Sequence, residues 1–152
     1  IIQLVNTTVS SSWTNDNPIY ARPGVLYSNY YYDTFDLTVS MAGTYAIGSD
    51  STIDTYGSLY NGSFVPGYPQ MNLLIHNGGS ESSSRQFQFQ VYLEPHVRYI
   101  LVATTYGTWT TGSYSVVVFG PQRITLIGTT IVVTTPLALI TDDGYRTDPT
   151  SK

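Results

Sequence analysis

The sequence contains no cysteine, and only 11% of its 152 residues are charged. Without thiols the chain has no disulfide framework and no thiolate chemistry, so burial and sheet hydrogen bonding must stabilise it unaided. Only six residues are basic and they are scattered, which argues against a groove that follows nucleic-acid phosphates. No apolar run approaches the roughly 20 residues that a membrane-spanning helix needs. We therefore expect no nucleic-acid partner and no membrane span.

What remains is typical of a β protein. The 152 residues suit one domain with extended arms, and 14 of them are tyrosine. Ser, Thr, Gly and Asn fill much of the rest, whereas the helix-favouring residues Ala, Leu, Glu and Lys are scarce. The net charge of −4 is mildly acidic. This composition favours a secreted or cell-surface β protein.

Two N-glycosylation sequons support an extracellular location. They are Asn6-Thr7-Thr8 and Asn61-Gly62-Ser63. The chain opens on Ile1–Val5, with neither an initiator methionine nor a signal-peptide pattern, so we expect a processed, mature chain. Asn6 and Asn61 are the expected glycan attachment sites, and the Thr-rich composition would also suit O-glycosylation.

Hydrophobic alternation predicts strands and no helix. In Gln86–Leu93 the apolar residues alternate strictly with polar ones, and in Asp33–Ser40 the residues Phe35, Leu37 and Val39 share one face. We expect Asp33–Ser40 to form a hairpin with Thr44–Gly48, and Ser10–Arg22 to be a polar loop. The remaining expected strands are 1–5, 53–60, 71–75, 97–105, 113–119, 123–127, 130–134 and 137–140. Short strands separated by regular turns predict an all-β, antiparallel β-sandwich or jelly roll with extended N- and C-terminal strands.

Five blocks occur in an order and spacing that resemble a known module. They are Asp33–Val39, Gly43–Ile47, Ile53–Tyr60, Val97–Val102 and Gly112–Val116. Together they resemble the pre-peptidase C-terminal (PPC) type of β-sandwich, which carries Gly-x-Tyr-x-Ile, Asp-x-x-Leu-Tyr and Gly-x-Tyr-x-Val blocks. The resemblance covers about residues 31–119. It implies a secreted, non-catalytic accessory or repeat module.

The resemblance divides the chain into three parts. Residues 1–30 form an N-terminal strand and irregular arm, 31–120 the PPC-like core, and 121–152 a C-terminal strand extension and tail. Related modules often carry an acidic, calcium-binding stretch after the fifth strand, whereas residues 76–81 here hold one acid, Glu81. The flanks outside the module are where we expect this chain's particular role to lie.

No motif in the sequence predicts catalysis. His76 and His96 lack a metalloprotease context, and the serine-rich loop lacks a nucleophile elbow. Glu81 and Glu94 are the only glutamates, and they make a poor glycosidase pair. The adjacent acids at 142 and 143 precede Gly144, as in a turn. We expect a protein that is not an enzyme.

A calcium site is the one cofactor that the sequence leaves open. Asp50 and Asp54 flank a short loop and could supply oxygen ligands to the ion. The alternative is that Asp54 caps a turn through its own backbone. We expect no other cofactor.

Aromatic residues in loop-like stretches raise the possibility of sugar binding. Trp109 lies in a Gly-bounded loop and is the best candidate for stacking on a sugar ring, with Trp13 and Tyr106 as further candidates. The alternative is that these rings pair across strands or anchor an interface. A sugar-binding chain would be a carbohydrate-binding accessory module of a secreted hydrolase or adhesin.

The terminal segments are apolar on both faces. Ile1, Ile2, Leu4 and Val5 form one such segment, and Ile131, Val132 and Val133 form another. A strand that is apolar on both faces would fill a gap in a neighbouring subunit, which is β-strand complementation. Ile1–Val5 is the expected donor, with Thr129–Thr134 as the alternative donor or part of the acceptor groove. The competing expectation is that both termini fold back into their own sandwich.

The sequence therefore predicts a non-catalytic extracellular structural subunit. Copies of the chain would assemble head to tail into a fibre or surface array, because strand exchange without closure produces a filament. The expected partners are other copies of the chain and glycans, either attached or bound. The alternative function is carbohydrate binding.

Overall fold

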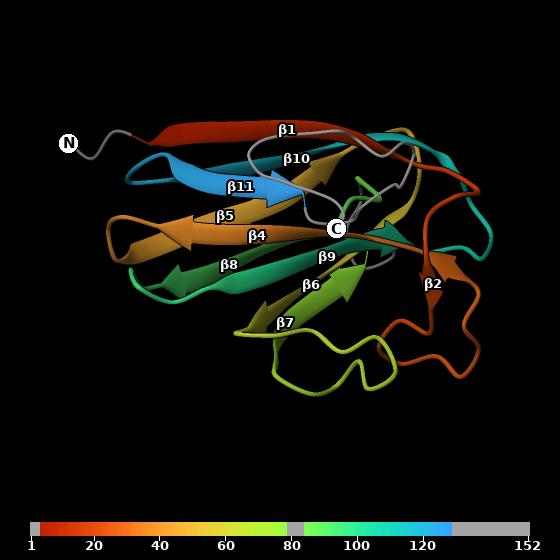
Figure 1. The fold of residues 1–152 in the computed structure, drawn as a ribbon. Coiled ribbons are helices and arrows are strands. Elements are labelled where there is room, and N and C mark those ends of the chain that lie inside the picture. Colours follow the sequence, from red (N-terminus) through yellow and green to blue (C-terminus); the bar gives the residue numbers. More distant parts are fainter. Residues whose placement is uncertain (1–3, 79–83, 129–152) are drawn as a thin grey trace, which may run out of the picture.

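The described part of the chain folds into two large antiparallel sheets packed face to face, and two further short strands form a small third sheet (Figure 1). The computed structural model describes residues 4–78 and 84–128, and no helix occurs among them. The expected all-β antiparallel sandwich is confirmed. The strands are β1 (Val5–Trp13), β2 (Ile19–Tyr20), β3 (Tyr30–Tyr31), β4 (Asp33–Val39), β5 (Gly43–Asp50), β6 (Thr55–Asn61), β7 (Leu73–Gly78), β8 (Gln88–Leu93), β9 (Tyr99–Thr105), β10 (Gly112–Gly120) and β11 (Ile124–Gly128).

Each sheet has its own strand order. The four-stranded sheet runs β1-β10-β5-β8, and the five-stranded sheet runs β11-β4-β9-β6-β7. The edge strands β1 and β11 contact each other on one side of the sandwich, and β7 and β8 contact each other on the opposite side. β1 and β11, which lie outside the 31–120 range, are thus edge strands of the two sheets.

The main core lies between the sheets, and the alternation in the sequence predicts its residues correctly. On β4 the inward residues Phe35, Leu37 and Val39 are buried. The same holds for Tyr45 and Ile47 on β5 and for Phe89 and Leu93 on β8, together with Phe87 just before it. Because the side-chain period of a strand is two, every second residue of these strands faces the opposite sheet.

A second, smaller core covers the outer face of the five-stranded sheet. The segment that carries β2 and β3 packs there, and its tyrosines contact residues of β6 and β9. This explains why every residue of β9 is buried, because both of its faces are covered. The cluster consists of Tyr20, Tyr30, Tyr32, Tyr60, Ile100 and Val102, with Val25, Phe64 and Leu73 partly buried against it.

The predicted hairpin is wrong. β4 belongs to the five-stranded sheet and β5 to the four-stranded sheet, so the turn at Met41-Ala42 crosses the sandwich instead of joining neighbouring strands. The Tyr45 hydroxyl donates to the Met41 carbonyl at 2.7 Å and so ties the crossing to β5. Alternation shows which face of a strand is buried, and that face is the same for a hairpin and for a crossing.

The predicted loop at Ser10–Arg22 is wrong in its first part, and several predicted boundaries change. Ser10–Trp13 continues β1, which pairs with β10 in unbroken register from Val5↔Gly120 to Trp13↔Gly112. A long partner strand therefore overrides the low strand propensity of three consecutive serines. β7 also runs on to Gly78, into the predicted loop at 77–84. Residues 1–3 and the predicted strands at 130–134 and 137–140 lie outside the described residues.

Trp13 fixes the end of β1 against the opposite sheet. Its side chain is 1% exposed, and its indole N–H donates to the Ala103 carbonyl of β9 at 2.9 Å. The indole also stacks on the Tyr114 ring of β10, with ring centroids 3.8 Å apart. One side chain thus joins three strands of both sheets.

Replacing Trp13 tests this role. Trp13→Ala should lower the free energy of unfolding by about 3–5 kcal/mol, because it leaves a large cavity and removes a buried hydrogen bond. Chemical denaturation at neutral pH measures the loss. Trp109→Ala, at a site that is 54% exposed, is the matched control and should cost less than about 1 kcal/mol. Equal losses for the two variants would contradict the assignment of Trp13 to the core.

Candidate functional site

The outer edge of β1 is the feature that most needs an explanation. β1 is nine residues long, contains no charged residue and no proline, and pairs with β10 without a register shift. Among residues 4–78 and 84–128, no strand pairs with its other side. Natural proteins usually protect such edges with charges, prolines or bulges, because an unpaired row of N–H and C=O groups recruits further strands.

The seam between β1 and β11 adds apolar surface to this edge. The Ile124 N–H donates to the Thr7 hydroxyl at 3.2 Å, which links the start of β11 to β1. Val9 and Leu126 pack against the core but are only partly buried, and Ile127 is exposed. The apolar surface at this seam is therefore incompletely covered by the described residues.

At the opposite seam, one side chain bridges β7 and β8. The Asn77 amide accepts the Gln88 backbone N–H at 3.0 Å and donates to the Gln88 carbonyl. Both backbone groups of Gln88 are therefore satisfied on the side that faces β7. Of the two seams, the one beside β1 is the better candidate to accept another strand.

The structure describes only two of the predicted interface residues. Val5 pairs with Gly120 of its own chain, so it belongs to β1 of its own sheet, and its place in an assembly interface stays a prediction. The register of β1 explains this, because Val5 continues the same ladder as Val9. Leu4 precedes β1 and is 61% exposed. Ile1, Ile2, Ile131, Val132 and Val133 lie outside the described residues.

The predicted sugar-stacking residues separate into two groups. Trp13 is wrong as an exposed platform, because it ends β1 inside the core. Trp109 and Tyr106 are exposed and lie in the loop between β9 and β10. Trp109 has a φ of 52°, a conformation that a bulky residue rarely adopts. Its N–H donates to the Asn29 carbonyl at 2.9 Å, which holds the loop in place.

Tyr106 also belongs to a cation–aromatic cluster that the sequence does not reveal. The Arg22 guanidinium lies 4.3–4.9 Å from the ring centroids of Tyr30, Tyr56 and Tyr106. It also donates to the Tyr106 carbonyl at 3.1 Å. Arg22 is buried, so the three rings and one carbonyl provide its surroundings. No local pattern could predict this cluster, because its members come from distant parts of the chain.

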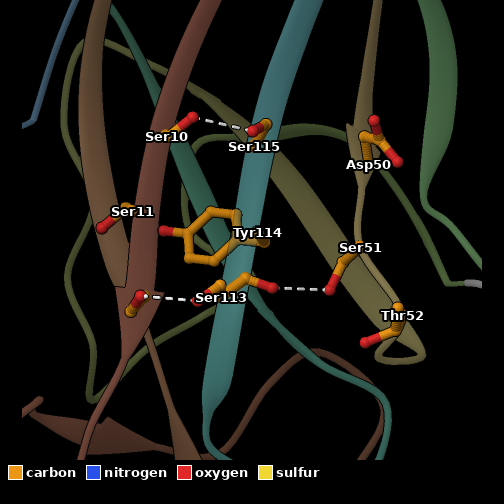
Figure 2. Close-up of a pocket in the computed structure, with 9 residues that line it drawn as sticks. Ser10, Ser11, Asp50, Ser51, Thr52, Ser113, Tyr114 and Ser115 are labelled. Carbon is orange, nitrogen blue, oxygen red and sulfur yellow. Dashed lines mark hydrogen bonds between the residues drawn. The ribbon is translucent and has the colours of Figure 1, made fainter.

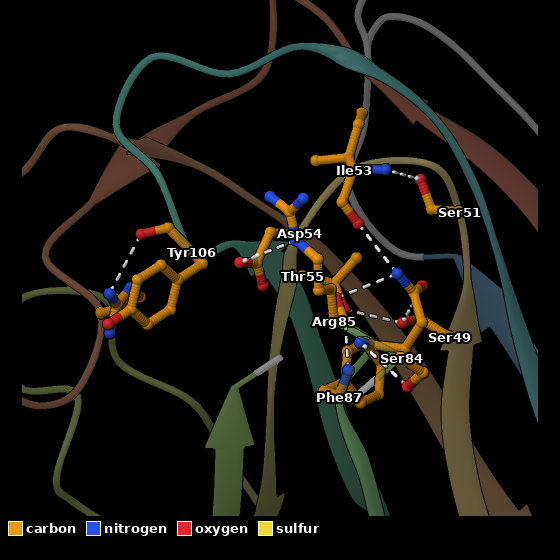
Figure 3. Close-up of polar contacts among 11 residues, drawn as sticks. Ser49, Ser51, Ile53, Asp54, Thr55, Ser84, Arg85, Phe87 and Tyr106 are labelled. Carbon is orange, nitrogen blue, oxygen red and sulfur yellow. Dashed lines mark hydrogen bonds and ion pairs between the residues drawn. The ribbon is translucent and has the colours of Figure 1, made fainter. Parts of the chain in front are cut away.

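A small pocket lies beside Tyr106. It has a volume of about 330 Å³ and includes Asp54, Arg85 and Thr110 in its lining. Figure 3 shows Asp54 and Arg85 paired, and the distance between Arg85 Nε and the Asp54 carboxylate is 3.5 Å. The pocket therefore combines an aromatic ring with a pair of opposite charges.

The two calcium candidates lie in different surroundings. Asp54 is engaged by Arg85, whereas Asp50 is exposed and lines a shallow depression of about 590 Å³ (Figure 2). Among the described residues, no group of three or more His, Asp or Glu side chains converges to hold a metal ion.

Hydroxyl groups line most of this depression. The Ser10 and Ser115 hydroxyls lie 2.8 Å apart, and the Ser12 hydroxyl donates to that of Ser113 at 3.2 Å. Among the described residues that line it, there is no histidine to act as a base for a serine nucleophile. The arrangement is therefore a polar surface built from cross-strand hydroxyl pairs.

The two sequons occupy different positions in the sandwich. Asn6 is exposed on β1, on the face of the four-stranded sheet that points away from the core. Asn61 is exposed at the end of β6, where its N–H donates to the Asn72 carbonyl at 3.0 Å. Both side chains are accessible to an attached sugar.

No protein-family model matches the chain, and no curated protein matches it. The resemblance of its strand blocks to PPC modules therefore stays a prediction. Among residues 4–78 and 84–128 there is no helix long and apolar enough to cross a membrane.

Asp33 is the one acidic residue of the described part of the chain whose pKa is clearly shifted. Burial raises the pKa of its carboxyl from the ordinary value of 3.8, although hydrogen bonds from Tyr114, Asn17 and Ser11 oppose the shift. The Asn17 amide donates to Asp33 at 2.6 Å and the Ser11 hydroxyl at 3.2 Å. The carboxyl thus connects β4 to the start of the polar arm and to β10.

The raised pKa of Asp33 predicts a pH dependence of stability. The folded-state pKa lies above the unfolded value, so the contribution of this group is full below about pH 3.8 and falls as the pH rises through the folded pKa. The free energy of unfolding of the wild type relative to Asp33→Asn should therefore decrease with rising pH over that window. Urea denaturation at a series of pH values measures the difference, and parallel pH profiles would contradict the shift.

Proposed function

We propose that the chain is a non-catalytic extracellular structural subunit that assembles head to tail by β-strand complementation. The observation that carries the proposal is the uncharged, nine-residue outer edge of β1, with which no strand of the described residues pairs. An added strand would satisfy the backbone groups on the outer side of β1 and cover the apolar side chains at the seam with β11. The resemblance to secreted PPC-type modules and the two sequons support the extracellular location.

The donor in this proposal is Thr129–Thr134. Val5 is used within its own sheet, which weakens the case for a donor at residues 1–5. Thr129–Thr134 follows β11 directly and contains the run Ile131-Val132-Val133, which is apolar on both faces of a strand. Burying each of these side chains in a neighbouring subunit would contribute about 1.5–3 kcal/mol. Because donor and acceptor are different surfaces, repeated pairing without closure gives a fibre.

Charge substitution in the donor tests the proposal. Size-exclusion chromatography with light scattering and negative-stain imaging should show filaments for the wild type. Ile131→Lys combined with Val133→Lys should leave monomers of unchanged thermal stability, because buried lysines oppose docking. Deletion of residues 1–4 is the matched control and should still assemble.

Two other outcomes would contradict Thr129–Thr134 as the donor. Loss of filaments on deletion of residues 1–4 alone would transfer the donor role to the N-terminus. A wild-type chain that stays monomeric at high concentration would contradict strand complementation by either terminus.

Carbohydrate binding is the second candidate, and the loop of Trp109 favours it. A bulky residue with positive φ, held by a backbone hydrogen bond with its ring half exposed, is costly to maintain. Such strain is common at binding sites. The Trp109 and Tyr31 rings meet in a T-shaped arrangement with centroids 5.7 Å apart, and Trp109 is 54% exposed, so its indole is accessible for stacking on a sugar.

Affinity electrophoresis in gels that contain polysaccharide tests this candidate. Trp109→Ala should weaken the apparent affinity for the polysaccharide by about 5- to 30-fold if stacking contributes about 1–2 kcal/mol, and retardation of the chain should fall accordingly. Tyr27→Ala, which removes another exposed ring, should migrate like the wild type. Equal retardation of wild type and Trp109→Ala would contradict a sugar site on this loop.

A further inference from the structure

The strand register places the Asn6 sequon beside an exposed aromatic ring. Asn6 of β1 is paired with Phe119 of β10, and both side chains point away from the core. Directly paired residues on one face of an antiparallel sheet have Cβ atoms about 4.5–5.5 Å apart. Phe119 is 44% exposed, and Tyr92 of β8 is a second exposed ring on this face.

The same row of the sheet continues into a depression. Phe119 is paired with Ala46 of β5, and Ala46 is paired with Gln90 of β8. In the next row Gly48 lies between Val117 and Gln88. Because Ala46 and Gly48 have almost no side chain, their neighbours rise on both sides of β5. The resulting hollow has a volume of about 390 Å³.

The lining of this hollow matches the surface of a sugar. One wall is apolar, formed by Val117 and Phe119, and the other carries the amide of Gln88. A pyranose ring has an apolar C–H face, which packs on an aromatic ring, and a rim of hydroxyls, which bond to amides and carboxylates. The volume falls in the range of small-ligand sites.

We infer that an N-linked glycan on Asn6 lies across the outer face of the four-stranded sheet. Its first sugar packs on the Phe119 ring, and the following sugars occupy the hollow over Ala46 and Gly48. The glycan is chosen as the occupant because its attachment atom lies in the same row as the ring and the hollow. The inference rests on the extracellular location in the proposed function.

The second sequon lacks these features and provides an internal comparison. Asn61 is paired with Tyr99, which is only 5% exposed because its ring belongs to the core between the sheets. A glycan on Asn61 therefore has no exposed ring opposite its attachment point. The contact with the protein is specific to Asn6.

The test uses the full chain secreted from a eukaryotic host with Asn61→Gln, so that Asn6 is the only sequon. Endoglycosidase trimming leaves one N-acetylglucosamine as the probe, and Asn6→Gln supplies the sugar-free reference. The single sugar should raise Tm by about 2–4 °C when Phe119 is present and by less than half of this in Phe119→Ala. Tyr92→Ala removes the other exposed ring of this face and should keep the full shift.

Nuclear Overhauser contacts between the sugar ring protons and Phe119 should accompany the shift. An equal Tm shift with and without Phe119 overturns the inference. It is also overturned if intact-mass measurement of the secreted chain shows that Asn6 carries no glycan. Concentration-dependent burial of Phe119 in the sugar-free chain also overturns it, because a second copy would then occupy the face. Filament imaging of the same samples tests the proposed function separately, and a monomeric chain with an ordered glycan leaves the inference standing.

Discussion

The register between β1 and β10 is the constraint on which the rest of the structure depends. Each strand has a side-chain period of two, so a slip by one residue would exchange the buried and exposed faces of β1. The Trp13 hydrogen bond to Ala103 and its stacking on Tyr114 hold the register at one end. The fixed register places Asn6 opposite Phe119 and turns Asn6, Thr8, Ser10 and Ser12 outward.

In the part of the chain that the structure describes, the same register leaves β1 as an edge strand that contains neither a charge nor a proline. Charges on an edge strand resist strand addition, whereas the sequence of β1, Val-Asn-Thr-Thr-Val-Ser-Ser-Ser-Trp, contains none. At the β7–β8 seam a single asparagine satisfies both backbone groups of Gln88. Backbone groups at the β7–β8 seam are thus bonded by a side chain of the neighbouring sheet. In the proposed assembly the β1 side of the sandwich is therefore the acceptor.

The sequence predicts the fold class and most strands because alternation depends only on local pattern. It does not predict which sheet a strand joins, so the crossing from β4 to β5 was expected as a hairpin. Ser10–Trp13 has little intrinsic preference for a strand, and its partner lies about a hundred residues away. The Arg22 cluster and the pairing of Asn6 with Phe119 depend on the same long-range contacts, and only the folded chain reveals them.

Hydrogen exchange of the β1 amides tests the central claim most directly. In an antiparallel edge strand, alternate N–H groups point away from the neighbouring strand. The account predicts that these amides exchange rapidly in the monomer and become protected when the chain assembles, while those bonded to β10 are protected in both states. Equal protection of all β1 amides in the monomer would contradict an open acceptor edge.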